Sequence, residues 1–159
     1  MGRPGMRRRF IATAMALALA VAGCAGPDVS PYVVAVDGLV LPTTWQVTKT
    51  VSRGTGGNAG CVQLADPMCP SVTRYYSAPG PLPDLYQDAR SDVLAAGFGD
   101  LVDSHPECDL ETNAARCSMA ATHGEVRIEI YLFPDGQDVD AFGVSVPGQA
   151  TVRVIARHS

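Results

Sequence analysis

The residues best able to do chemistry in this sequence are its cysteines. Cys61 and Cys69 stand eight positions apart in the stretch CVQLADPMCPS. Two cysteines this close can ligate a metal, act as a redox pair or close a disulfide. Zinc sites usually space cysteines two to four residues apart and add a second pair or histidines, and redox dithiols usually read Cys-x-x-Cys. Neither pattern occurs here, so a disulfide is favoured if the chain lies in an oxidising compartment.

The N-terminus bears on the compartment. Its first ten residues include four arginines, and the apolar run at 10–22 carries no charge. That run is shorter than the ~20 helical residues needed to cross a hydrocarbon core. A charged head followed by a short apolar run and small residues is typical of a secretory signal. The final positions, Val21-Ala22-Gly23-Cys24, resemble the lipobox of bacterial lipoproteins.

This resemblance implies that residues 1–23 are a signal peptide that is removed and that Cys24 is the lipidation site. In that family the cysteine sulfur receives a diacylglycerol, and the new amino terminus often receives a further acyl chain such as palmitate. Two or more chains anchor a protein stably. The expected location is therefore the extracytoplasmic face of the cell membrane, with the lipid as anchor. The alternative is an ordinary signal peptide in which Cys24 is incidental.

Assigning Cys24 to lipid leaves four cysteines, Cys61, Cys69, Cys108 and Cys117. Outside the cytoplasm an even set of this kind is expected to form disulfides. Four cysteines allow three connectivities, and the sequence alone does not choose between them. We predict local pairing, Cys61–Cys69 and Cys108–Cys117, because the four cysteines form two close pairs.

The three histidines do not form a recognisable site. His105, His123 and His158 lack the i, i+4 spacing of a helical zinc site. We expect His123 to lie in a turn, and we keep His105 as a candidate base. No metal ligand, catalytic residue or cofactor is predicted.

The carboxylates are also typical of solvated segments. Asp135, Asp138 and Asp140 do not follow the spacing of an EF-hand loop, so we expect an acidic surface loop. Glu125 and Glu129 flank Arg127, a pattern that favours a solvent-facing strand over a paired-carboxylate acid/base site.

The net charge of the chain limits the classes of partner that it can bind. The whole chain has a formal net charge of -4, with 12 basic and 16 acidic residues. Four of the basic residues lie in the expected signal peptide, so the remaining chain is more acidic still. Nucleic acid is excluded as a partner because its binding needs clustered Lys and Arg. The net charge also argues against a polybasic second contact with anionic lipid.

The elements that position these residues follow from periodicity. We expect a lipidated N-terminus and tether at 24–38 and one domain at 39–159. Alternation predicts strands near 45–51 and 71–76, with Trp45, Val47 and Val51 on one face, and a weaker strand at 99–105. Leu82 to Ala96 has helical spacing, and Gly97 follows as a C-terminal cap.

The C-terminal third completes the predicted sheet. We predict a hairpin with a two-residue turn at His123-Gly124, pairing Ala121 with Val126 and Met119 with Ile128. A last strand is predicted at 151–157. The fold class is α+β, with an antiparallel sheet of about four to five strands, one main helix on one face and two disulfides.

The part after the leader resembles uncharacterised small lipoproteins of high-GC Gram-positive bacteria. The similarity lies in Trp45, in the CPS-x-x-R-x-Y element at Cys69–Tyr76 and in AAGF at Ala95–Phe98. The resemblance brings no known activity with it.

Together these features favour a non-catalytic binding domain in the cell envelope, held at the membrane by Cys24, with an envelope protein or glycan as partner. Tyr75, Tyr76 and Tyr131 fit either an exposed aromatic patch or internal packing. One alternative is an envelope hydrolase using His105 with Asp103, Glu107 or Asp109. Another is a proteinaceous inhibitor that presents the loop at 52–60.

Overall fold

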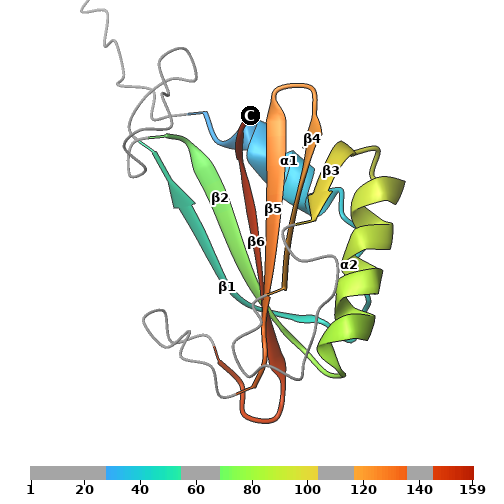
Figure 1. Cartoon of the computed structure of the whole chain (residues 1–159). Helices are drawn as coiled ribbons and strands as arrows, with labels where there is room; N and C mark the ends of the chain where they lie inside the picture. The colour runs from blue at the N-terminus through green and yellow to red at the C-terminus, as the bar shows by residue number, and fades with distance from the viewer. Residues whose placement is uncertain (1–27, 55–68, 104–116, 136–144) are drawn as a thin grey trace, which may run out of the picture.

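The computed structural model describes residues 28–54, 69–103, 117–135 and 145–159. They form two layers, a twisted antiparallel sheet and two helices on the same side of it (Figure 1). The elements are α1 (Ser30–Asp37), β1 (Gln46–Arg53), β2 (Ser71–Ala78), α2 (Leu82–Ala95), β3 (Gly99–Asp103), β4 (Cys117–His123), β5 (Val126–Phe133) and β6 (Ala150–His158). The α+β class predicted from the sequence is confirmed.

The sheet has six strands in the order β1-β2-β6-β5-β4-β3, and every described pairing is antiparallel. The prediction of four to five strands was therefore wrong. The last strand, β6, lies between β2 and β5, so it joins the two halves of the chain. One edge is the short strand β3, whose five residues give only a weak alternating pattern. The other edge is β1.

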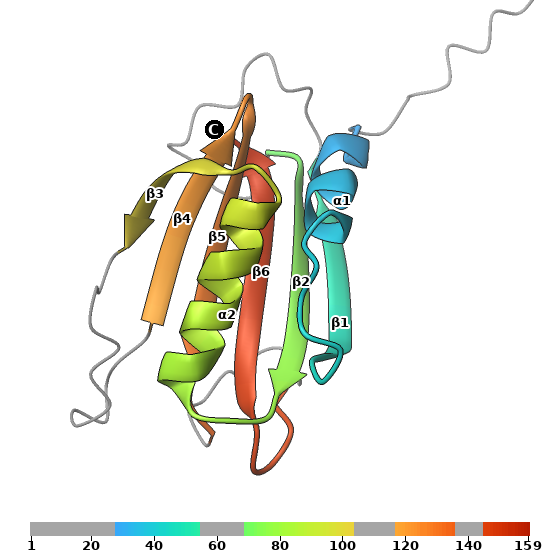
Figure 2. The same cartoon turned by 90° about the vertical axis from the view of Figure 1, so that its right-hand side faces the viewer.

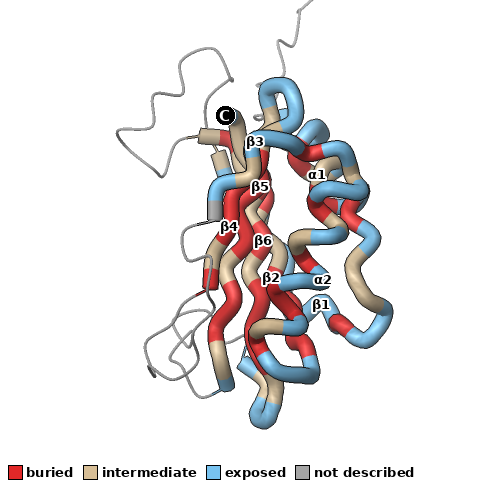
Figure 3. Tube along the Cα trace, turned by 45° about the vertical axis from the view of Figure 1, so that its right-hand side comes forward, coloured by how far each residue is buried: buried red, intermediate tan, exposed pale blue. Residues whose placement is uncertain are grey.

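The core lies between the sheet and the helices. Alternate residues of the central strands point to the helix side and are fully buried, among them Ile128, Ile130, Val152 and Val154. Helix α2 packs over β4 and β5, and α1 packs over β2, β6 and β5 (Figure 2). The burial pattern follows this division along the strands (Figure 3).

Helix α2 forms where the periodicity predicts it. Its apolar stripe, Leu82, Leu85, Tyr86, Ala89 and Val93, is buried against the sheet. Pro83 lies in the first turn, where no backbone donor is needed. Gly97 follows the helix with a φ of 83°. This is the left-handed conformation that favours glycine after a helix.

Helix α1 was not predicted. It occupies residues that were assigned to the tether 24–38, yet Tyr32 and Val36 are buried in the core. The sequence SPYVVAVD does not indicate a helix, because its valines are β-branched and such residues favour strands. Only one side of these two turns reaches the core. Asp37 at its end forms an ion pair of 2.7 Å with Arg74 on β2.

The β4–β5 hairpin forms with a different turn from the predicted one. The loop residues are Gly124 and Glu125, and His123 pairs with Val126. Gly124 has a φ of 58°, which suits it to the first loop position. The ring Nδ1 of His123 instead donates to the carbonyl of Gly97, 2.8 Å away, and so ties the hairpin to the end of α2. The pairing is displaced by two residues from the predicted one, since Met119 pairs with Ile130 instead of Ile128. A shift by an even number of residues leaves the predicted faces unchanged.

Strand β1 departs from the predicted alternation. Its register shifts between Val47 and Lys49, so Val47 pairs with Tyr76 and Lys49 with Tyr75. Val47 and Lys49 therefore lie on opposite faces, and the prediction that Val47 shares a face with Val51 was wrong. Such a bulge inserts one extra residue and re-aims the side chains that follow. Trp45 precedes the strand and packs edge-on against Tyr76, with ring centroids 6.2 Å apart.

Candidate binding surface

The sheet face opposite α1 and α2 carries the most unusual group of side chains, and we call it the open face. Strand alternation and register assign its residues, because the core residues of β2, β5 and β6 point the other way. Its principal side chains are Lys49, Val51, Arg53, Thr73, Tyr75, Arg127, Glu129, Tyr131, Phe133, Arg153, Ile155 and Arg157.

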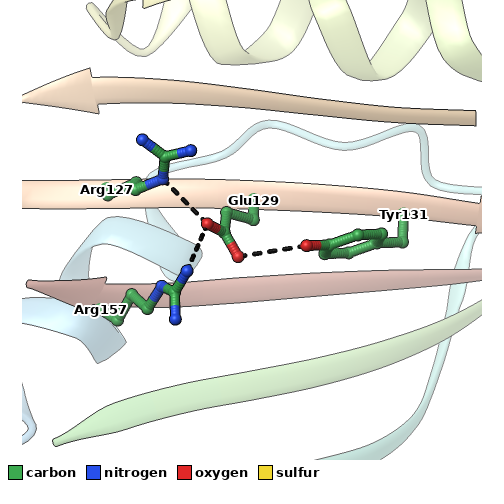
Figure 4. Close-up of polar contacts among 4 residues, drawn as sticks. All are labelled: Arg127, Glu129, Tyr131 and Arg157. Carbon is green, nitrogen blue, oxygen red and sulfur yellow. Dashed lines mark hydrogen bonds and ion pairs between the residues drawn. The ribbon is translucent and has the colours of Figure 1, made fainter. Parts of the chain in front are cut away.

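Glu129 on β5 is the centre of a polar network on this face (Figure 4). Its Oε1 accepts hydrogen bonds from Nε of Arg127 at 2.8 Å and from Nη2 of Arg157 at 2.6 Å. Its Oε2 accepts a bond from the Tyr131 hydroxyl at 3.3 Å. Arg127 and Tyr131 flank Glu129 on the same strand, and Arg157 reaches across from β6. The carboxylate thus fixes two arginines and a tyrosine.

These contacts keep Glu129 ionised. Its side chain is only 8% exposed, whereas those of Arg127 and Arg157 are 35% and 29% exposed. Burial acts to raise the pKa of Glu129, but the hydrogen bonds from Arg157 and Arg127 outweigh it, and the pKa lies below its ordinary value. The expectation that Glu129 faces solvent was wrong, because its carboxylate is buried beneath its partners. The network keeps one net positive charge, which its arginines present to solvent.

Arg153 on β6 is held differently. Its guanidinium carbon lies 4.4 Å from the ring centroid of Tyr131 and 5.6 Å from that of Phe133, as in cation–π contacts. Tyr75, its neighbour on β2, is buried in the same small cluster as Phe133. The buried Nε of Arg153 has no hydrogen-bond partner in the described part of the chain. The aromatic rings therefore position a cation that no described carboxylate neutralises.

The tyrosines do not form an exposed patch. Tyr75 and Tyr76 are 3% and 5% exposed and lie on opposite faces of β2. Tyr76 belongs to the main core with Trp45, and Tyr75 packs beside Phe133 on the open face. Packing, one of the two interpretations left open by the sequence, accounts for both residues.

Charge is divided between the two sides of the molecule. Within the described ranges, five of the seven Lys and Arg residues lie on the open face, and Glu129 is the one acidic residue that projects from its central strands β2, β5 and β6. Asp100 borders this face, where its carboxylate accepts a bond from Thr122. The helix side carries Asp37 and the acidic residues of α2. An acidic chain thus presents one basic face.

The chemistry of this surface is suited to binding. A carboxylate whose pKa is lowered by two arginines is a poor proton donor or acceptor near neutral pH. Partly exposed guanidinium groups recognise carboxylates or phosphates. In the described ranges, no group of three or more His, Cys, Asp or Glu side chains is arranged to hold a metal ion.

Several predicted site residues lie outside the described residues, namely Cys24, Cys61, Cys108, His105, Asp138 and Asp140. Cys69 and Cys117 are described, and each is disulfide-bonded. Cys117 begins β4 and is buried in the core, whereas Cys69 lies just before β2. The proposed pairing of the four cysteines stays a prediction.

The remaining predicted residues have structural roles. His158 lies on β6, and its Nδ1 donates to the carbonyl of Glu125 at 2.9 Å. The carboxylate of Asp135 accepts a bond from the backbone N–H of Gly148 at 2.9 Å, which joins the two ends of the β5–β6 connection. The hydrolase alternative rests on residues beyond Asp103 that are not described.

The open face was not predicted as a site. Arg153 and Arg157 were placed correctly on the outward side of the last strand, and Arg127 and Glu129 were placed on one strand face. The outward direction shared by these residues was the signal in the sequence that could have indicated a site. The sequence did not show that β5 pairs with β6, and this pairing sets Glu129 beside Arg157.

The chain matches no family model, no curated protein and no solved structure. Among the described residues, neither helix is long and apolar enough to span a membrane.

Proposed function

We propose that the protein is a lipid-anchored, extracytoplasmic binding domain of the cell envelope, without catalytic activity. Residues 1–23 act as a lipoprotein signal peptide, and Cys24 carries the lipid. The observation that carries the binding role is the open face, where Arg153 lies on aromatic rings without a described carboxylate partner. The binding role and the anchor are separate statements, and each has its own test.

The composition and size of the open face support a binding role. Arginine is among the residue types enriched in binding hot spots, and the open face presents the guanidinium groups of Arg127 and Arg157 partly to solvent. Six strands spaced about 4.8 Å apart and about eight residues long make a surface of roughly 700 Å². Standard-size interfaces bury about 600–1,000 Å² on each partner. The face is therefore large enough to serve as a complete docking surface.

The binding role is tested by site-specific photocrosslinking in cells. A photoreactive residue replaces Thr73, which lies on the open face between Val51 and Ile155, and a matched control replaces the exposed Ser91 on α2. We expect a discrete adduct, to a protein or to a lipid, from position 73 and little from position 91. Equal adducts from both positions, or adducts from position 91 alone, would contradict the choice of this face.

The anchor is tested independently by Cys24→Ser. We expect the wild-type protein to enter the detergent phase and its N-terminal peptide to carry the mass of a diacylglycerol and an acyl chain. The variant should remain in the aqueous phase. An unmodified Cys24 in the mature wild-type protein would refute lipidation.

We further propose local disulfides, Cys61–Cys69 and Cys108–Cys117. Cys69 and Cys117 lie at opposite ends of the sheet, because Cys117 shares a cross-strand row with Tyr76. Seven residues along β2 and three strand spacings separate the two cysteines by about 27 Å. A disulfide requires Cα atoms closer than about 7 Å. This distance argues against a bridge between Cys69 and Cys117 and leaves two connectivities.

Chain length favours the local connectivity of these two. Cys108 follows the end of β3 by five residues, a reach of about 18 Å at full extension. The end of β3 lies about 25 Å from Cys69, across four strand spacings and five residues of β2. A Cys69–Cys108 bridge would therefore require a fully stretched chain. Peptide mapping of the unreduced protein tests the pairing, and a cross-linked peptide joining 69 to 108 would refute it.

A further inference from the structure

The division of charge bears on how the anchored domain sits at the membrane. We propose that the open face lies against the anionic phospholipid headgroups of the membrane that holds the anchor. This inference rests on the proposed lipidation of Cys24. It differs from the expectation drawn from net charge, because the structure separates the charges that the net value averages.

The length of the tether favours contact. Asp28 and Val29 are already fixed at the start of α1, so the tether is the four residue steps from Cys24 to Asp28, which reach at most about 14 Å. Packed layers of helices or sheets lie about 10 Å apart, and side chains extend a further few ångströms beyond the sheet. The lipid can therefore reach the plane of the open face, but the domain cannot move far from the bilayer.

Electrostatics then selects the orientation of the domain. The open face carries Lys49 and Arg53 on its exposed edge strand, Arg153 at its centre, and the arginines around Glu129. The acidic side chains of α2 point away on the other layer, where an anionic surface repels them less. Each Lys or Arg near an anionic membrane raises affinity about fivefold. The planar guanidinium donors of the arginines suit phosphate oxygens.

Two other occupants fit the structure less well. An added peptide strand would pair with an edge, β1 or β3. Both edges have irregular register, β1 carries Lys49 and β3 has only five residues, and these features discourage edge pairing. A second copy could offer its acidic α2 to the open face, but such head-to-tail contacts do not close unless the rotation forms a ring. The membrane surface, in contrast, is held next to this face by the tether.

Vesicle co-sedimentation tests the proposal without the lipid. All described core residues lie between Tyr32 and Ala156, so a chain of residues 25–159 keeps that core. We expect it to bind vesicles of phosphatidylglycerol and phosphatidylcholine at low salt, to bind pure phosphatidylcholine poorly, and to dissociate at about 0.5 M NaCl. The variant K49Q/R53Q changes two exposed residues and should lose at least tenfold in affinity.

The matched control is R90Q, which removes a positive charge from α2 on the other side. It should change vesicle affinity less than twofold. Equal losses for R90Q and K49Q/R53Q would overturn the proposal, as would binding that ignores lipid charge. Binding to poly-glutamate but not to the anionic vesicles would overturn it in favour of an acidic polymer as partner.

The same measurements separate the two proposals. If Cys24 proves unmodified while residues 25–159 still bind anionic vesicles through Lys49 and Arg53, the anchor is wrong and the membrane-facing surface stands. If Cys24 is lipidated and the domain ignores anionic vesicles, the anchor stands and this inference fails.

Discussion

Glu129 shows how a single carboxylate can organise a surface that no helix covers. It is nearly inaccessible, although its arginine partners are about one-third exposed. Removing one partner from such a group leaves charges without compensation, which costs more than the pair contributes. The side chains of Arg127, Tyr131 and Arg157 therefore depend on Glu129 for their positions.

Glu129→Gln should destabilise the fold at neutral pH by about 2 kcal/mol, the scale of hydrogen bonds to charged groups. Because the folded-state pKa of Glu129 is lowered, its contribution is present above the ordinary carboxyl pKa near 4.5 and is lost as pH falls through the folded value. The difference between variant and wild type should therefore shrink in acid. Urea denaturation at several pH values measures this effect.

Glu125→Gln is the control for this prediction. Glu125 is exposed in the β4–β5 turn, and its described hydrogen bonds, from His158 and from the backbone N–H of Ser159, go to its carbonyl and not to its side chain. It should leave both the stability and its pH dependence nearly unchanged. A difference between E129Q and wild type that stays constant from neutral to acidic pH would show that the charge of Glu129 does not contribute.

Gly54 is a second residue on which the local structure depends. Its φ is +135°, and a Cβ at this position would lie 2.5 Å from the Cα of Pro70. Gly54→Ala should lower the free energy of unfolding by well over about 1 kcal/mol, because the alanine would take up a strained φ and the backbone at Pro70 would also have to move. Gly148 also has a positive φ, of 78°, but open space around it, so Gly148→Ala should cost only about 1 kcal/mol. Equal melting temperatures for the two variants would contradict the close approach at Gly54.

At the scale of the element, α2 combines favourable and unfavourable charges. Asp84 lies in the first turn, where the helix dipole favours an anion, and Asp92 lies near the end, where it does not. One carboxylate oxygen of Asp92 is buried without a described hydrogen-bond partner. Burial and the nearby Asp88 raise the pKa of Asp92. The charged form of Asp92 therefore weakens the fold at neutral pH.

Asp92→Asn should stabilise the protein at neutral pH by about 0.3–1 kcal/mol, and Asp84→Asn should destabilise it by a similar amount. The raised pKa means that the penalty of Asp92 is absent in acid and grows as pH rises through the folded value. The stabilisation by D92N should therefore vanish at a pH low enough that Asp92 is protonated in both the folded and the unfolded protein. Thermal melts of the two variants in neutral and acidic buffer provide the comparison. At neutral pH the melting temperature should rise for D92N and fall for D84N, and changes of the same sign would contradict the prediction.

Elements with long, regular patterns were predictable from the sequence, and short or interrupted ones were not. Helix α2 has five buried residues at helical spacing, and β6 alternates over most of its length. Helix α1 fully buries only Tyr32 and Val36, too few to show a period. In β1 the bulge breaks the alternation before Lys49. The hairpin turn lies at Gly124-Glu125, and His123 remains in the strand, where its ring bonds to Gly97.

At the scale of the whole molecule, the candidate surface depends on contacts between distant parts of the chain. The sequence shows that Arg153 and Arg157 point away from the core, but not which strands lie beside them. The insertion of β6 between β2 and β5 brings Tyr75, Tyr131 and Glu129 to these arginines. Local periodicity carries no information on strand order, so this part of the site required the structure.

The two proposed disulfides lie at opposite ends of the sheet, and this arrangement predicts how they contribute to stability. Each closes a loop of about ten residues, for which loop-closure entropy gives roughly 2.5 kcal/mol. Sites this far apart without shared partners contribute additively. Replacing Cys61 and Cys69 by Ala, or Cys108 and Cys117 by Ala, should each lower the free energy of unfolding by about that amount. The variant in which all four cysteines are replaced, which we call the fourfold variant, should lose the sum of the two free-energy changes. Urea denaturation of all three variants measures these losses. A fourfold variant no less stable than either double variant would show that the two bridges do not act as independent local constraints.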